Sequence, residues 1–281
     1  MMVIVDSQVH IWGPETPEKP YVKENASAPH RPIPLTHEEL LREMNAAGVD
    51  RCVCVPPTWE GFSNEESLRA ARLHPDRFKV MGRIAIDKPE SRTLLAAWKQ
   101  QPGMLGIRSA FHQGKAKDWL EDGTAEWFWE GAEKYQIPVM AFAPHAVPKL
   151  GEIAKNHPGL RLIIDHMGLS TALRGKPLDD AVATLCKLAP QKNVAVKVSA
   201  LPVYVTEPYP FPSLHPLIKR VVETFGPERC FWGTDLSHLP CSYKECVTLF
   251  TEELSFLSER DKELVMGRAI ADWIGWPLSQ T

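Results

Sequence analysis

The stretch VDSQVHIW at residues 5–12 has the alternation of a β-strand, whose successive side chains point to opposite faces. Asp6, Gln8 and His10 therefore share one face. A buried polar face is costly unless its groups are paired or bound to a ligand. The stretch predicts a strand that enters a buried polar site, with His10 nearest the C-terminal end of the strand.

Short apolar runs recur along all 281 residues, and about eight of them are long enough to be strands. Each run is almost continuously apolar, which is typical of parallel strands covered on both faces. The first run begins at residues 3–5. The others occupy residues 52–55, 79–84, 105–108, 138–142, 162–165, 194–198 and 230–233.

Amphipathic stretches separate these runs and predict helices. One helix is expected to start at Thr36, with Glu39 completing a capping box, and to end at Gly48. The others are expected near residues 64–73, 91–100, 124–135, 147–156, 178–188, 214–225 and 243–257. About eight strand–helix units predict a single (β/α)8 TIM barrel over residues 1–281, with its active site at the C-terminal strand ends. A doubly wound open sheet is the alternative, but no glycine-rich nucleotide motif follows the first strand.

Composition is that of an ordinary globular protein, with a formal net charge of −3. No basic stripe points to nucleic acid, and no apolar run is long enough to cross a membrane. The N-terminus lacks the features of a secretion signal, so we expect a cytoplasmic protein with six reduced cysteines. We expect a small-molecule substrate, and the sequence is compatible with a homo-oligomer.

Residues 13–34 form the one irregular region, rich in proline and polar residues. In a barrel this segment follows the first strand and lies over the catalytic face. Its length favours an active-site cover, with a plain surface loop as the alternative.

Two later strands also end in residues suited to catalysis. The sixth strand runs into His166, and the eighth runs into Asp235. Together with His10, three separate strands end in His, His and Asp. Imidazole and carboxylate side chains suit either a divalent metal or a metal-free acid–base pair.

These motifs resemble those of the amidohydrolase superfamily, in the branch whose lactonases open aromatic-degradation and sugar lactones. Residues 6–12 are similar to the strand-one D-x-H-x-H-x-W signature of that family. The matching segments of later strands are residues 106–108, 164–168, 197–199 and 231–235. The resemblance covers essentially the whole chain, up to the helix near Trp273.

The resemblance implies roles for the three strand-end residues. Asp235 would be the general base, whereas His10 and His166 would polarise the substrate or hold a metal together with Asp235. Gln8 stands where the family has the first histidine of its signature, and an amide oxygen is a weaker metal ligand than imidazole. Zinc or manganese dependence therefore stays open, with Gln8 as a weak oxygen contact. No organic cofactor is expected.

Three cations near strand ends are the candidates for substrate binding. Arg83, Arg108 and Lys197 are expected to be buried, and buried cations need partners. Internal ion pairs with Asp6 or Asp165 would satisfy them. An anionic substrate group is the functional alternative, because the guanidinium fork matches a carboxylate.

Three further residues are expected near the mouth. Trp12 is a candidate pocket wall, and Tyr204 lies in a proline-rich stretch after the seventh strand. His145, after the fifth strand, is the candidate to replace the missing ligand, although a loop position is the simpler interpretation. His112 and His238 have the same two interpretations.

We expect hydrolysis of a small, carboxylate-bearing lactone in catabolism, and less readily of an amide or cyclic imide. The first alternative is metal-assisted, non-oxidative decarboxylation of an aromatic acid, which a related branch performs. The second is a barrel that binds a ligand without catalysis, favoured only by Gln8.

Overall fold

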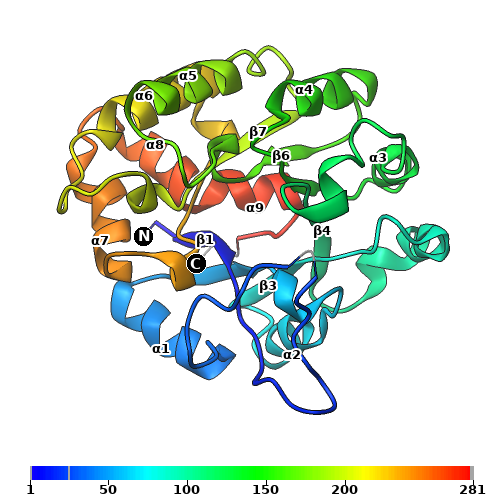
Figure 1. The fold of residues 1–281 in the computed structure, drawn as a ribbon. Helices are drawn as coiled ribbons and strands as arrows, with labels where there is room; N and C mark the ends of the chain where they lie inside the picture. The colour runs from blue at the N-terminus through cyan, green and yellow to red at the C-terminus, as the bar shows by residue number, and fades with distance from the viewer. Residues whose placement is uncertain (1, 25, 279–281) are drawn as a thin grey trace.

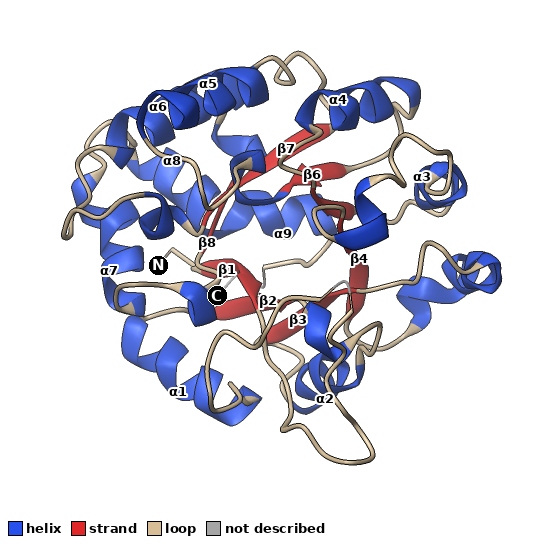
Figure 2. Cartoon of the chain, viewed as in Figure 1, coloured by secondary structure: helices blue, strands red, loops and turns tan. Residues whose placement is uncertain are grey.

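The computed structural model describes residues 2–24 and 26–278, and in it eight parallel strands form one nearly closed barrel. The strands lie side by side in chain order, which confirms the predicted (β/α)8 architecture (Figures 1 and 2). They are β1 (Val5–Val9), β2 (Arg51–Cys54), β3 (Phe78–Gly82), β4 (Met104–Ala110), β5 (Val139–Phe142), β6 (Leu162–Ile164), β7 (Val194–Ser199) and β8 (Cys230–Gly233).

The barrel is closed by contacts between the end of β8 and β1. The backbone N–H of Asp235 donates to the carbonyl oxygen of Gln8 at 2.9 Å. Asp6 accepts hydrogen bonds from the backbone and hydroxyl of Thr234 at 3.0 and 2.5 Å, and from the Tyr243 hydroxyl at 2.8 Å. The buried Asp6 thus holds β1 to β8, and its position depends on an irregular register in β1 between Asp6 and Val9.

The α-helices surround the strands (Figure 2). They are α1 (His37–Ala47), α2 (Glu65–Leu73), α3 (Glu126–Lys134), α4 (Val147–Asn156), α5 (Gly175–Cys186), α6 (Leu214–Phe225), α7 (Tyr243–Thr248), α8 (Glu259–Glu263) and α9 (Ala269–Ile274). The expected caps of α1 are present, since Thr36 accepts from the Glu39 N–H and Gly48 adopts a φ of 81°. The expected helix near residues 91–100 is instead a 3₁₀ segment, η2 (Pro89–Gln100). None of the described helices is both long and apolar enough to span a membrane.

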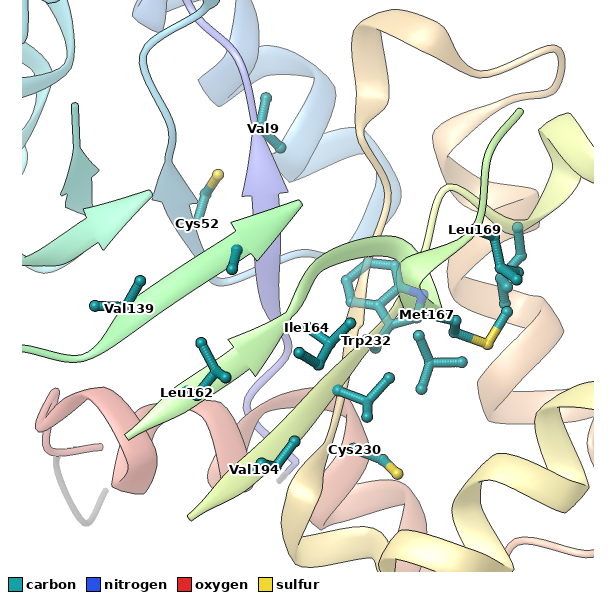
Figure 3. Close-up of a cluster of buried hydrophobic side chains, with 14 of the residues drawn as sticks. Val9, Cys52, Val139, Leu162, Ile164, Met167, Leu169, Val194, Cys230 and Trp232 are labelled. Atoms are coloured by element: carbon teal, nitrogen blue, oxygen red, sulfur yellow. The ribbon is translucent and has the colours of Figure 1, made fainter. Parts of the chain in front are cut away.

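Two apolar layers hold the barrel together. Figure 3 shows strand residues of the outer layer, such as Val139, Leu162 and Val194. Helical residues such as Leu150 and Ile218 belong to the same cluster. A smaller cluster fills the N-terminal half of the interior, with Val5, Met81 and other strand residues packed against the C-terminal helix. Polar residues occupy the other half of the interior, toward the strand C-termini. All six cysteines are free thiols, as expected.

The irregular segment 13–34 crosses the C-terminal mouth of the barrel (dark blue in Figure 1), although Asn25 lies outside the described residues. Three loops hold it there. The Ser27 N–H donates to Thr58 Oγ1 at 2.9 Å, Gln113 donates to Ser27 Oγ at 3.1 Å, and His30 contacts Ser237 Oγ at 2.9 Å. Ser27 and His30 also line the central cavity, which agrees with an active-site cover.

Candidate active site

A cavity of about 320 Å³ lies at the C-terminal mouth of the barrel. His10, His166 and Asp235 all line it, each from the end of a different strand, and each residue is 6% exposed. His10 Nε2 lies 3.3 Å from Asp235 Oδ1, and His166 Nε2 lies 3.9 Å from Asp235 Oδ2. The three residues singled out from the sequence therefore meet around one carboxylate.

The backbone is strained where β6, β7 and β8 end in this cavity. His166, Ala200 and Asp235 have φ values of 51°, 57° and 56°, in the left-handed region that non-glycine residues rarely adopt. Each such residue costs on the order of 1 kcal/mol, and this kind of strain gathers at functional sites. His166 and Asp235, at the ends of β6 and β8, therefore have unfavourable backbone conformations.

The proton positions on His10 follow from its neighbours. His10 Nδ1 donates to the carbonyl oxygen of Val55 at 2.7 Å, because a carbonyl can only accept. Burial, reinforced by the charge of Arg108, lowers the pKa of His10 well below its usual range. The ring is therefore neutral, and its Nε2 carries a lone pair that faces the cavity.

The side chain of Gln8 is oriented by a buried ammonium group. Lys197 Nζ donates to Gln8 Oε1 at 2.5 Å, and an ammonium group has no lone pair to accept with. The amide nitrogen of Gln8 therefore faces His10 Nε2, at 3.3 Å. The amide oxygen of Gln8, expected as a weak contact to a metal, binds Lys197 in this structure.

The donor set does not fit a divalent metal. The Gln8 amide hydrogen points at the lone pair with which His10 would bind one, and a metal ligand must present a lone pair instead. Among the described residues, no group of three or more His, Cys, Asp or Glu side chains is arranged to hold a metal ion. The geometry favours the acid–base alternative over the metal alternative.

Asp235 has the properties of a general base. Burial raises the pKa of its carboxyl group from 3.8 to about 6, against the opposing charges of His238 and Arg108. Asp235 Oδ1 is buried and has no hydrogen-bond partner in the described protein. A carboxylate with a free lone pair and a pKa near neutrality is suited to take a proton and to return it.

His166 is positioned by a hydroxyl group on the neighbouring strand. Its Nδ1 lies 2.8 Å from Ser199 Oγ, at the end of β7. Burial lowers the pKa of His166 to about 3, although Asp165 opposes the shift, so the ring is neutral at pH 7. When Ser199 donates to Nδ1, the ring proton of His166 is on Nε2 and faces the cavity.

A buried ion network lies beneath the cavity. Asp165 pairs with Arg108 Nε and with Lys197 Nζ, each at 3.0 Å. Burial alone would raise the pKa of Asp165, but Lys197 and Arg108 together lower it to about 2. The expectation of internal ion pairs is met at Asp165 and not at Asp6, which instead binds Thr234 and Tyr243.

The two arginine candidates occupy different places. Arg108 lines the central cavity, and Asp165 accepts a hydrogen bond only from its Nε. Arg83 lies behind it, in a side chamber, and does not reach the central cavity. The structure therefore separates two residues that the sequence presented as equivalent.

The remaining candidates divide in the same way. Tyr204 lines the cavity, where its hydroxyl donates to the Leu169 carbonyl at 3.2 Å. Trp12 is buried one layer away, edge-on to Trp59 at 5.1 Å, and supports the wall without forming it. His145 is exposed and lines a separate surface hollow, so the suggestion that it replaces a metal ligand is wrong.

Sequence reasoning missed several cavity residues. Segment 13–34 supplies His30, whose ring centroid lies 3.9 Å from that of His238 and 5.8 Å from that of His10. Ser199, which contacts His166 from behind the cavity, lies in the family segment 197–199, and the sequence alone assigns it no role. No local pattern marks either residue, because only the closed barrel and the folded cover bring them to the site.

Comparisons with known proteins identify a family and two relatives of this chain. A family model described as Amidohydrolase matches residues 5–275. A 4-sulfomuconolactone hydrolase of Hydrogenophaga intermedia is 27% identical, covering 83% of this chain and 74% of that protein. An L-fucono-1,5-lactonase of Burkholderia ambifaria is also 27% identical, covering 82% and 79%.

Solved structures share the fold. A probable 2-pyrone-4,6-dicarboxylic acid hydrolase of Acinetobacter baumannii, with citric acid bound, superposes with a TM-score of 0.79 at 18% identity, covering 98% of this chain and all of that chain. A zinc-bound amidohydrolase of Burkholderia multivorans has a TM-score of 0.76 at 18% identity with the same coverage. A 5-carboxyvanillate decarboxylase of Sphingomonas paucimobilis has a TM-score of 0.71 at 13% identity, covering 98% and 99%.

Proposed function

This chain belongs to the amidohydrolase family and is a hydrolase, and we propose that it opens a small, carboxylate-bearing lactone by attack of a water molecule that Asp235 activates. The observation that carries the proposal is the meeting of Asp235, His10 and His166 in one cavity beside Arg108. The two lactone hydrolases to which the chain is similar support the choice of a lactone.

In the first step, water loses a proton to Asp235 as its oxygen attacks the lactone carbonyl. The free lone pair of Asp235 Oδ1 accepts this proton. His10 Nε2 lies 3.3 Å from the same oxygen and accepts from the Gln8 amide, so the ring of His10 bounds the position of the water without bonding to it. Attack converts the carbonyl oxygen into an oxyanion.

The oxyanion is stabilised by hydrogen-bond donors and by the local charge. His166, with its proton on Nε2, donates to this oxygen, and the guanidinium of Arg108 adds positive charge in a buried setting. Lys197 and Arg108 share the single carboxylate of Asp165, so these groups leave one net positive charge beside the oxyanion once Asp235 has taken the proton. Such preorganised charge is worth several kcal/mol in related oxyanion sites.

In the second step, the tetrahedral intermediate collapses and the ring C–O bond breaks. Asp235 returns its proton to the leaving ring oxygen, which becomes the hydroxyl of the product. The ring-opened product is a hydroxy acid, and its new carboxyl group ionises at neutral pH. One proton is therefore released per turnover, and Asp235 is again a carboxylate.

Arg108 is the proposed partner of the substrate carboxylate. Its Nε is held by Asp165 at 3.0 Å, which fixes the guanidinium plane and leaves the terminal nitrogens for a ligand. The planar fork suits a carboxylate, and Arg108→Lys keeps the charge but loses the fork. We expect this change to raise KM for acidic lactones more than for neutral ones.

A screen of lactones with and without a carboxylate, followed by a pH-stat, tests the proposal. Lactone hydrolysis releases one proton and no gas, whereas the alternative decarboxylation of an aromatic acid releases carbon dioxide. Asp235→Asn should lower turnover by about 10²- to 10⁴-fold, the usual contribution of general acid–base catalysis. Carbon dioxide release from aromatic acids, or near-normal turnover by Asp235→Asn, would contradict the proposal.

A further inference from the structure

A small side chamber of about 60 Å³ lies behind the central cavity, between the ends of β3 and β4. The two spaces share part of their walls, including Arg108, His112 and Gln113. Beyond this shared wall the chamber is lined by Arg83 and by apolar side chains such as Trp119. The chamber therefore adjoins the central cavity at Arg108.

Arg83 is a half-buried cation without a counter-ion. It forms no ion pair with any carboxylate in the described part of the chain, and its Nη1 is buried with no hydrogen-bond partner. A buried donor on a charged group is unfavourable when it has no partner. Burial, together with the charge of Arg108, lowers the pKa of Arg83 to about 9, so the group is still a cation at neutral pH.

The rest of Arg83 is held rigidly, so the free nitrogen has a fixed direction. Its Nε donates to the Gly61 carbonyl at 2.8 Å. Its backbone N–H and carbonyl oxygen both bond to the side chain of Asn64, at 2.7 and 3.0 Å. The guanidinium carbon lies 5.4 Å from the centre of the Phe62 ring. A preorganised donor of this kind loses little entropy when it binds an anion.

The neighbouring polar groups also have unused hydrogen-bonding capacity. His112 Nδ1 is buried and has no partner among the described residues. Burial lowers the pKa of His112 to about 4, so the ring is neutral and can donate one hydrogen bond. Gln113 already donates to Ser27 through its amide nitrogen, and its unpartnered Oε1 can only accept, so Gln113 contributes no donor to an anion.

We propose that this chamber is an anion-binding subsite. In it, Arg83 binds an anionic arm of the substrate, at a point separate from the group held by Arg108. The inference rests on the proposed function for the identity of the substrate, and on the geometry of Arg83 for the anion. A volume of about 60 Å³ admits a few atoms, the size of one carboxylate, sulfonate or phosphate group. Arg83 is thus a specificity-determining residue that selects substrates with a short acidic arm.

The first experiment measures binding without catalysis. Acetate, methanesulfonate and inorganic phosphate are titrated into the protein, and the indole NMR signal of Trp119, assigned with Trp119→Phe, reports occupancy of the chamber. Arg83→Gln should weaken the tightest of these anions by about 10- to 100-fold, the usual effect of losing one charged hydrogen-bond donor. The matched control is Arg92→Gln, which removes an exposed arginine that stacks on Trp127.

A second variant keeps the test decisive if Arg83→Gln does not fold. Ala116 lines the chamber, and Ala116→Leu fills it while Arg83 remains in place. Ala116→Leu should abolish the Trp119 response to anions and leave the hydrolysis of arm-free lactones unchanged. Anion binding that is equal in wild type, Arg83→Gln and Ala116→Leu would overturn the subsite.

A kinetic experiment separates this inference from the proposed function. With a lactone that carries a short acidic arm, Arg83→Gln should raise KM by at least tenfold; with the arm-free lactone it should leave KM unchanged. Equal effects on both substrates would overturn the specificity role. If no lactone is turned over, the proposed function fails, whereas the Trp119 titration still shows whether the chamber binds anions.

Discussion

Asp235→Asn should make the protein more stable at neutral pH while it removes activity. The carboxyl pKa rises from 3.8 to about 6 on folding, so the folded state binds this proton more tightly than the unfolded state. Stability from this group is complete below pH 3.8 and is lost as the pH rises through 6. At 1.36 kcal/mol per pH unit, ionised Asp235 costs the folded protein about 3 kcal/mol.

Asparagine carries no charge at any pH, so the substitution removes this cost. We expect the melting temperature at pH 8 to rise by roughly 5 °C, and the gain to disappear near pH 4. Scanning calorimetry of wild type and Asp235→Asn from pH 4 to 8 measures the difference. Asp179→Asn, which changes an exposed carboxylate on α5, is the matched control.

The pH dependence of catalysis provides the second half of the same test. If Asp235 is the base, wild-type kcat/KM should fall about tenfold for each pH unit below 6, because only the carboxylate accepts a proton. Two results would refute the reasoning. One is a stability difference between wild type and Asp235→Asn that does not change with pH, and the other is a rate that stays level down to pH 4.5.

Three further predictions follow from the same geometry. Asp165→Asn should destabilise the protein by about 3–5 kcal/mol in urea at pH 7, because Arg108 and Lys197 both lose their carboxylate; a loss below about 1 kcal/mol would contradict the network. Exhaustive chelation should leave the rate unchanged, because the Gln8 amide presents a hydrogen where a metal needs a lone pair; stoichiometric metal that survives chelation, by elemental analysis, would contradict this. His145→Ala should keep kcat/KM within roughly twofold of wild type, and a larger kinetic loss in a folded variant would bring this residue back into the site.

The fold and the meeting of His10, His166 and Asp235 in one cavity could be predicted from the sequence because both depend on local patterns. Apolar runs in regular alternation with amphipathic stretches predict strands and helices, and chain order then predicts the order of the strands. A parallel barrel brings all its strand C-termini to one mouth. Polar residues just beyond the strands, such as His10, His166 and Asp235, therefore meet there whatever the lengths of the intervening helices.

Other features depend on contacts that no local pattern encodes. Strict alternation places Asp6 on the same face as Gln8, but the irregular register of β1 turns it toward Thr234 and Tyr243. The cover residue His30 reaches the cavity only through the path of segment 13–34. The place of Arg83 could not be predicted either, because residue type and strand position do not show whether it lines the central cavity or the side chamber.

The replacement of a signature histidine by Gln8 illustrates why residue identity alone did not decide the chemistry. An amide can present either its oxygen or its nitrogen, and the choice depends on the partner at its other end. That partner is Lys197, 189 residues away in sequence, and its ammonium group binds the oxygen and turns the nitrogen toward His10. A histidine at position 8 would offer Lys197 at most a neutral ring nitrogen and would bring a second imidazole beside His10. The amide and the ammonium group therefore act as one unit, and together they set which atom of Gln8 faces His10 beside Asp235.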